Sequence, residues 1–276
     1  MADVRIGISG WRYRGWRGDF YPKGLVQRDE LAYAARRLGS IEINGSFYSL
    51  QRPSSYASWA RETPGDFEFA VKGGRFITHM KKLNGVESAL ANFFASGLLA
   101  LGPKLGPVLW QLPATAVFDA DRLAAFFGQL PRTTVAAAEL ATLHDEKVAS
   151  DRALTEASVD LPVRHALEGR HHSFGTDEAL SLLRTHDIAC VSSDAGDKWP
   201  RFDEVTSDFA YVRLHGAEEL YVSGYTEQSL DSWTERITAW SAGGADVYVY
   251  FDNDAKVHAP YDAMRLMERL GLSKAG

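Results

Sequence analysis

The chain has 276 residues, of which 45% are hydrophobic and 24% are charged, a composition typical of a globular protein that buries a sizeable core. Its formal net charge of -6 argues against an extended nucleic-acid-binding face, which needs clustered lysine and arginine, but not against a local basic pocket. The one cysteine, Cys190, excludes an intrachain disulfide and a cysteine-based zinc site. No apolar stretch approaches a membrane span and residues 1–8 carry no signal-peptide pattern, so we expect a cytoplasmic protein without a membrane partner.

Short apolar runs rich in valine, isoleucine, phenylalanine and tyrosine recur along the whole chain. Runs of this length and composition are typical of parallel strands that are buried on both faces. They predict strands at residues 4–9, 41–44, 67–72, 107–111, 163–168, 188–193, 209–214 and 247–251.

Helix-like segments separate these strands, and several begin with a capping signal such as Asp119 or Asp121, Thr176 or Pro260. Strands that alternate with helices indicate a parallel sheet, and eight units in a chain of 276 residues favour closure into a (β/α)8 TIM-type barrel. We therefore expect one α/β domain over residues 1–276, although the length alone would also allow two domains. The predicted helices cover residues 28–38, 54–61, 86–101, 120–130, 176–185, 227–240 and 260–270.

Residues 132–161 interrupt this alternation between the fourth predicted helix and the fifth predicted strand. The stretch is alanine-rich over residues 134–149 and charged over residues 144–152. We interpret it as an inserted helical segment that serves packing or a partner contact and carries no chemistry.

Ionisable, amide and aromatic side chains follow nearly every predicted strand. In α/β barrels the active site lies at the carboxyl ends of the strands, so these side chains are the expected site for a small polar ligand. In strand order they are Trp11; Glu42, Asn44 and Tyr48; Lys72 and His79; Gln111; Glu168, Arg170 and His171; Asp194; Arg213 and His215; and Asp252, Asn253 and Asp254.

Several of these residues fall within longer motifs that run from about residue 4 to about residue 270. The motifs are Gly7-Ile8-Ser9-Gly10-Trp11, Glu42-Ile43-Asn44 with Phe47-Tyr48, Val71-Lys72 with Thr78-His79, Glu168 with Arg170-His171, Tyr211-Val212-Arg213-Leu214-His215-Gly216, and Tyr250-Phe251 with Asn253-Asp254. Together they resemble the DUF72 family, also called the YecE-like family. The resemblance implies a TIM-barrel fold but implies no activity.

Three positions depart from the pattern of the family that the chain resembles. Phe174 stands where the family often has tryptophan, Asp252 where asparagine is common, and Ala217 where arginine is frequent. Asp252 adds negative charge, and Ala217 removes a contact to an anion. Both departures bear on which ligand this chain takes.

The acidic and histidine side chains support two interpretations. Carboxylates and imidazoles that converge from several strands can bind a divalent metal such as Mn²⁺, Mg²⁺ or Zn²⁺. Lys72, Arg170 and Arg213 lie among them, however, and favour a network of ion pairs instead. We therefore expect no metal cofactor, and keep a metal-dependent hydrolase or isomerase as an alternative.

His215 is the leading candidate for general acid–base catalysis, because a histidine beside a carboxylate can exchange a proton near neutral pH. Glu168, Asp194 and Asp254 complete the catalytic candidates, and a purely structural His215 is the alternative. The cations can bind a phosphate or carboxylate group, or can be held by neighbouring carboxylates. The substrate-binding candidates are Trp11, Glu42, Asn44, Tyr48, Lys72, His79, Gln111, Arg170, His171, Arg213 and Asn253.

These candidates favour an enzyme, either a hydrolase, an isomerase or a lyase, because a large buried set of ionisable groups costs stability unless it serves a function. Its expected substrate is a small anionic molecule, phosphorylated or carboxylated, and similar to a sugar or a nucleotide. The alternative is a non-catalytic sensor or binding protein for a nucleotide or a nucleic-acid end. The sequence does not indicate an oligomeric state.

Overall fold

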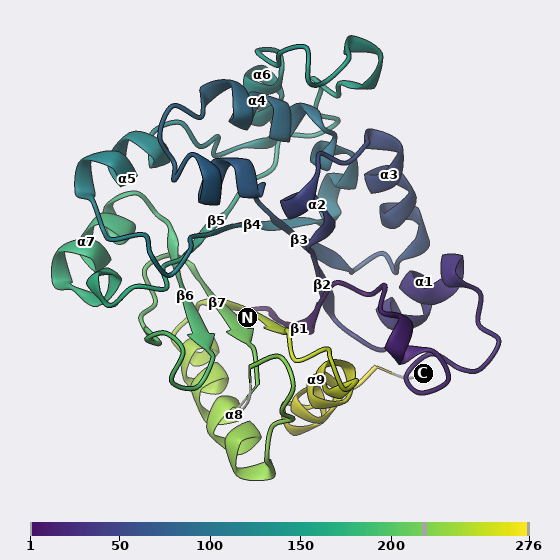
Figure 1. Cartoon of the computed structure of the whole chain (residues 1–276). Helices are drawn as coiled ribbons and strands as arrows, with labels where there is room; N and C mark the ends of the chain where they lie inside the picture. Colours follow the sequence, from purple (N-terminus) through teal and green to yellow (C-terminus); the bar gives the residue numbers. More distant parts are fainter. Residues whose placement is uncertain (1, 217–219, 275–276) are drawn as a thin grey trace. The chain divides into compact units, whose positions relative to one another are not determined.

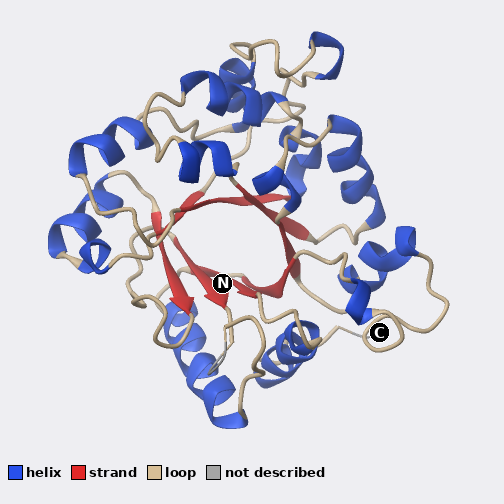
Figure 2. Ribbon diagram, in the orientation of Figure 1, coloured by secondary structure: helices blue, strands red, loops and turns tan. Residues whose placement is uncertain are grey.

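A computed structural model describes residues 2–216 and 220–274, so Ala217 lies outside the described residues. Parallel strands β1 to β8 form a closed barrel in chain order, which confirms the predicted TIM-type fold (Figure 2). The strands are β1 (Val4–Ser9), β2 (Ser40–Ile43), β3 (Glu68–Lys72), β4 (Leu105–Gln111), β5 (His165–Glu168), β6 (Ala189–Asp194), β7 (Phe209–Leu214) and β8 (Asp246–Phe251).

The described residues divide into two compact units by their internal contacts. The first unit comprises the described residues of 1–42 and 189–276, and the second comprises residues 43–188. The expected single domain over residues 1–276 stays a prediction.

The first unit contains β1, β6, β7 and β8 together with α1 (Glu30–Ala35), α8 (Glu227–Ala242) and α9 (His258–Arg269). Parallel pairing places Ser9 opposite Glu42 and Arg213 opposite Tyr250. Helices α8 and α9 lie side by side (Figure 1). The Thr226 hydroxyl caps α8 by accepting a hydrogen bond from a backbone N–H of its first turn.

The second unit contains β3, β4 and β5 together with six α-helices. Asp119 and Thr176 cap the helices that follow them, as the sequence predicts, because each side chain accepts a hydrogen bond from the first turn. Register pairs Gln111 with Glu168 at the carboxyl ends of β4 and β5. The helices are α2 (Gly45–Tyr48), α3 (Pro53–Glu62), α4 (Glu87–Ala95), α5 (Ala120–Phe127), α6 (Thr134–Ala141) and α7 (Asp177–Thr185).

Two expected helices of the second unit are shorter in the structure. The helix expected over residues 86–101 ends at Ala95, because Gly97 takes a left-handed backbone conformation with φ of 108°. The inserted segment is α-helical only over α6 and forms a short 3₁₀ helix over Ser150–Arg152. No helix in residues 2–216 and 220–274 is both long enough and apolar enough to cross a membrane.

Candidate functional site

A fully buried ion pair joins Glu42 at the end of β2 to Arg213 near the end of β7. Arg213 Nη2 donates to Glu42 Oε1 at 2.9 Å, and Arg213 Nε donates to Oε2 at 3.1 Å. The Ser9 hydroxyl donates to Oε1 at 2.9 Å, and the Tyr211 hydroxyl donates to Oε2 at 2.6 Å. Both oxygens of Glu42 therefore bind two protein donors each, which makes the pair an anchor for the strand ends.

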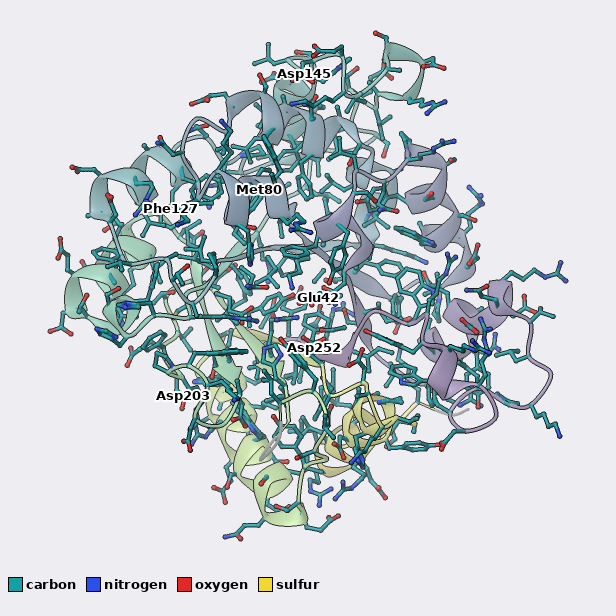
Figure 3. All side chains as sticks on the ribbon, in the orientation of Figure 1. Glu42, Met80, Phe127, Asp145, Asp203 and Asp252 are labelled. Atoms are coloured by element: carbon teal, nitrogen blue, oxygen red, sulfur yellow. The ribbon has the colours of Figure 1, made fainter. Side chains whose placement is uncertain are left out.

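Arg213 also binds Asp252, which follows β8. Arg213 Nη2 donates to Asp252 Oδ2 at 2.9 Å, and His215 Nδ1 lies 3.0 Å from the same oxygen. Glu42 and Asp252 are labelled in Figure 3, and both lie against the guanidinium of Arg213. Asp252 is partly exposed, with 14% of its side-chain surface accessible, whereas the side chains of Arg213 and His215 are fully buried. A ligand would therefore reach Asp252 before it reached His215.

The ring of His215 lies between two aromatic side chains of the first unit. Trp199 and Tyr221 each meet it edge to face, with ring centroids 5.4 Å away. Arg213 Nη1 lies 3.4 Å from His215 Nε2. Because a guanidinium only donates hydrogen bonds, this contact favours a lone pair on Nε2 and the ring proton on Nδ1, on the side of Asp252.

Asp254 faces Tyr13, which follows β1. Burial raises the pKa of the Asp254 carboxyl above its usual range, and the negative charge of Asp252 raises that pKa further. The Tyr13 hydroxyl donates to the backbone oxygen of Ser9 at 2.5 Å. The contact of Tyr13 with Asp254 acts in the opposite direction and lowers the pKa of that carboxyl. Burial and the two neighbouring carboxylates also raise the pKa of Tyr13, so that it stays a phenol.

We call Glu42, Arg213, His215, Asp252 and Asp254 the acid–histidine cluster. The other candidates of the first unit have other partners. Asp194 accepts a hydrogen bond from Trp233 in α8 at 3.3 Å. The Asn253 amide donates to Ser223 O and to Asp262, each at 2.9 Å. Trp11 is buried, and its backbone oxygen accepts from Tyr21 at 2.6 Å.

A second group of charged side chains lies in the second unit. Glu168 is fully buried at the end of β5, and Arg170 Nε donates to it at 2.7 Å. His79 Nδ1 lies 2.9 Å from the Thr78 hydroxyl, and His79 Nε2 lies 3.4 Å from the Gln111 amide nitrogen.

Lys72 ends β3, and its ammonium lies over the ring of Phe47, 4.6 Å from the centroid. Phe47 meets the His79 ring edge to face at 5.1 Å. Burial, followed by the positive charges of Lys72 and Arg170, lowers the pKa of His79, which favours a neutral imidazole. We call Lys72, His79, Gln111, Glu168 and Arg170 the cationic cluster, because two permanent cations accompany one carboxylate.

The remaining candidates of the second unit lie outside this cluster. Asn44 precedes α2, and no donor in the described part of the chain reaches its buried Oδ1. The Tyr48 side chain is exposed. His171 Nδ1 lies 2.9 Å from the Ser173 hydroxyl and accepts from the Ser173 backbone N–H, so it caps the short 3₁₀ helix that follows.

Within residues 2–216 and 220–274, no three histidine, cysteine, aspartate or glutamate side chains are grouped closely enough to hold a metal ion. Sequence reasoning named Tyr211 within a motif but not among the candidate site residues, although Tyr211 binds Glu42 directly. Tyr211 lies two residues before Arg213 on β7, and the two-residue period of a strand places both side chains on one face. That period is the signal that would have identified Tyr211.

Comparison with known sequences decides the family. The sequence matches the family described as "Protein of unknown function DUF72" over residues 5–276. The chain belongs to the DUF72 family. This confirms the resemblance on which the expected fold rested.

DUF72 relatives come from several bacteria. The UPF0759 protein YunF of Bacillus subtilis is 23% identical over 303 residues, and the alignment covers 99% of this chain and 96% of YunF. The UPF0759 protein YecE of Escherichia coli is 28% identical over 112 residues, which cover 41% of this chain and 38% of YecE.

Solved structures of DUF72 proteins share the fold. A crystal structure from Thermotoga maritima superposes with a TM-score of 0.78 at 25% identity and covers 98% of this chain and 99% of its own. A crystal structure from Enterococcus faecalis gives a TM-score of 0.75 at 17% identity, covering 99% of this chain and 97% of its own.

Proposed function

We propose that the protein is an enzyme that acts on a small anionic substrate, phosphorylated or carboxylated and similar to a sugar or a nucleotide, by acid–base catalysis. The proposal assigns proton transfer to the acid–histidine cluster of the first unit. Asp254 is the proton donor, and His215 acts through Asp252. The cationic cluster of the second unit is by itself a candidate binding site for an anionic group.

The observation that carries the proposal is the difference in solvent exposure between the side chains of the acid–histidine cluster. Arg213 and His215 are fully buried, yet both converge on Asp252, which is partly exposed. Burying ionisable side chains costs stability, so a buried pair that holds a carboxylate at an accessible position suits a functional site. Asp254, with its raised pKa, supplies an acid beside that carboxylate.

The cationic cluster is suited on its own to bind an anionic group. Arg170 presents a planar fork that suits phosphate or carboxylate, and Lys72 adds a second positive charge. A neutral His79 adds no charge of its own to this cluster. Phosphate binding to the Arg170→Gln variant should be weaker by about tenfold or more in isothermal titration calorimetry.

The test uses a panel of sugar phosphates, nucleotides and small carboxylates incubated with the protein in D₂O. Proton and phosphorus NMR spectra report both turnover and the exchange of substrate hydrogen for deuterium. We expect at least one compound to react, and we expect Asp254→Asn and His215→Asn to slow that reaction by about a hundredfold or more. The Asp151→Asn variant, which changes an exposed aspartate outside both clusters, is the control. Full activity of His215→Asn would contradict the proposal.

A non-catalytic binding protein for a nucleotide or a nucleic-acid end is the second candidate. Complete pairing of Glu42 with Arg213, Ser9 and Tyr211 favours it, because a satisfied network holds a shape without exchanging protons. Saturable nucleotide binding in calorimetry without conversion of any panel compound would support this candidate instead.

A further inference from the structure

A pocket of about 210 Å³ lies wholly in the second unit, bordered by α2, the short helix Phe76–Met80 and α4. Its walls are mainly apolar and include Phe47, Phe76, Ile77 and Phe93. Phe93 and Ile77 are buried, whereas Phe76 is 39% exposed at the rim. An apolar cavity of roughly 150 Å³ is large enough for benzene, so this pocket has room for one aromatic ring and a short substituent.

The charged side chains that line the pocket are both cations, Arg75 and Lys147, and no carboxylate lines it within the described residues. The Lys147 ammonium lies 5.2 Å from the centroid of the Phe76 ring. Lys81, beside the pocket, lies 5.9 Å from the same ring. The positive rim contrasts with the net charge of -6 of the whole chain and favours an anionic ligand.

Lys147 comes from the inserted segment, and side-chain hydrogen bonds fix its backbone. Asn92 in α4 donates to Asp145 at 2.8 Å and accepts from the Asp145 backbone N–H at 3.0 Å. Asp145, labelled in Figure 3, accepts in turn from the Lys147 backbone N–H at 3.0 Å. These bonds give residues 132–161 a local role, which is to hold a cation at the mouth of the pocket.

We propose that this pocket is a binding site for a small aromatic carboxylate, with its ring among the phenylalanines and its carboxylate between Arg75 and Lys147. The aromatic walls match the ring, and the two cations match the charge. The site goes beyond the proposed function, because neither the acid–histidine cluster nor the charged groups of the cationic cluster line it.

Phenylacetate is the probe, and ligand-observed NMR titration of the whole protein is the measurement. A ligand of this size should bind with a dissociation constant of about 1 mM or lower. Two matched compounds separate the ring from the charge. Acetate has the charge without the ring, and 2-phenylethylamine has the ring with the opposite charge, and each should bind about tenfold more weakly or not at all.

Variants of pocket residues test whether phenylacetate binds in this pocket. Ala89→Leu in α4 fills part of the cavity with a residue of high helix propensity, and should weaken phenylacetate binding by about tenfold. The matched control, Ala125→Leu, adds the same side chain at an exposed position of α5 and should leave binding unchanged. The Arg75→Gln, Lys147→Gln double variant should also weaken binding by about tenfold, and its urea unfolding curve shows whether it folds.

The outcomes separate this site from the proposed function. Arg170→Gln should leave phenylacetate binding intact while it weakens phosphate binding, and the double variant at Arg75 and Lys147 should do the reverse. Equal binding of phenylacetate and 2-phenylethylamine would overturn the proposal, as would full binding by Ala89→Leu. Absence of phenylacetate binding to the unaltered protein would overturn it as well.

Discussion

At the scale of single residues, Glu42 and Arg213 are the most strongly constrained side chains of the candidate site. They are separated by 171 positions in the sequence, yet each binds the other through two hydrogen bonds. Sequence reasoning placed both residues at strand ends, which the structure shows. It could not pair them, because several carboxylates were candidate partners for each cation. Pairing depends on side-chain direction, which the strand pattern alone does not define.

Removing one member of this pair should destabilise the fold strongly. Glu42→Gln would leave the buried guanidinium of Arg213 without its carboxylate, so the free energy of unfolding should fall by about 3 kcal/mol or more. Glu227→Gln is the control, because Glu227 pairs with arginines at the surface, where solvent screens the pair, and its loss should cost much less than that of Glu42. Urea unfolding measures both. Equal losses would mean that burial of the Glu42–Arg213 pair does not decide its contribution.

At the scale of secondary-structure elements, the predicted strands and most predicted helices match the structure. The helix predicted over residues 86–101 extends too far. Residues 86–101 read as a continuous helix because their apolar spacing does not break at Gly97. The break is caused by tertiary packing: a Cβ at Gly97 would lie 2.4 Å from the Cα of Pro53 at the start of α3. The tetrapeptide helix α2 was not predicted, because four residues carry too little periodicity to be recognised.

Gly97→Ala should therefore destabilise the protein by about 2 kcal/mol or more, since alanine would meet both a positive φ and the Pro53 backbone. Gly65→Ala is the matched control, because nothing lies within 4 Å of an added Cβ there. Thermal or urea unfolding distinguishes them. A loss for Gly97→Ala no larger than that for Gly65→Ala would show that the segment adjusts without strain.

At the scale of the whole molecule, stability should depend on pH through His165. This side chain accepts from Trp110 Nε1 on one ring nitrogen and lies 2.8 Å from Pro131 O on the other, so it is held neutral. Burial lowers the pKa of His165 to about 3. In the unfolded chain the pKa is about 6.5, so below that pH only the unfolded state takes up the proton. Stability is then lost as the pH falls from about 6.5 towards 3, by up to roughly 5 kcal/mol.

His165→Gln tests this dependence, because glutamine can accept from Trp110 and donate to Pro131 without titrating. The free energy of unfolding of the variant should fall less between pH 7 and pH 4.5 than that of the unaltered protein. Parallel curves for the two proteins would mean that other groups account for acid sensitivity.

The barrel could be predicted from the sequence because alternation of strands and helices repeats over the whole chain and does not depend on any single residue. The location of candidate groups at strand ends followed from the same alternation. Their individual directions did not. Asp194 binds Trp233 of α8, and His171 caps a short helix, although both stand at strand ends in the sequence. His171 lies beyond the end of β5, where the two-residue alternation of a strand no longer defines the direction of a side chain.

The central claim is that the pKa of Asp254 is raised beside Asp252, so that Asp254 can serve as an acid. A titration of Asp254 tests this most directly because no substrate is needed. The carboxyl carbon of Asp254 is followed by ¹³C NMR in protein labelled at aspartate, and Asp254→Asn assigns the signal. The account predicts a midpoint above the usual aspartate value of about 3.9, and a still higher midpoint in Tyr13→Phe, where the contact that lowers the Asp254 pKa is lost. A midpoint at or below the usual value in the unaltered protein would contradict the assignment of Asp254 as the proton donor.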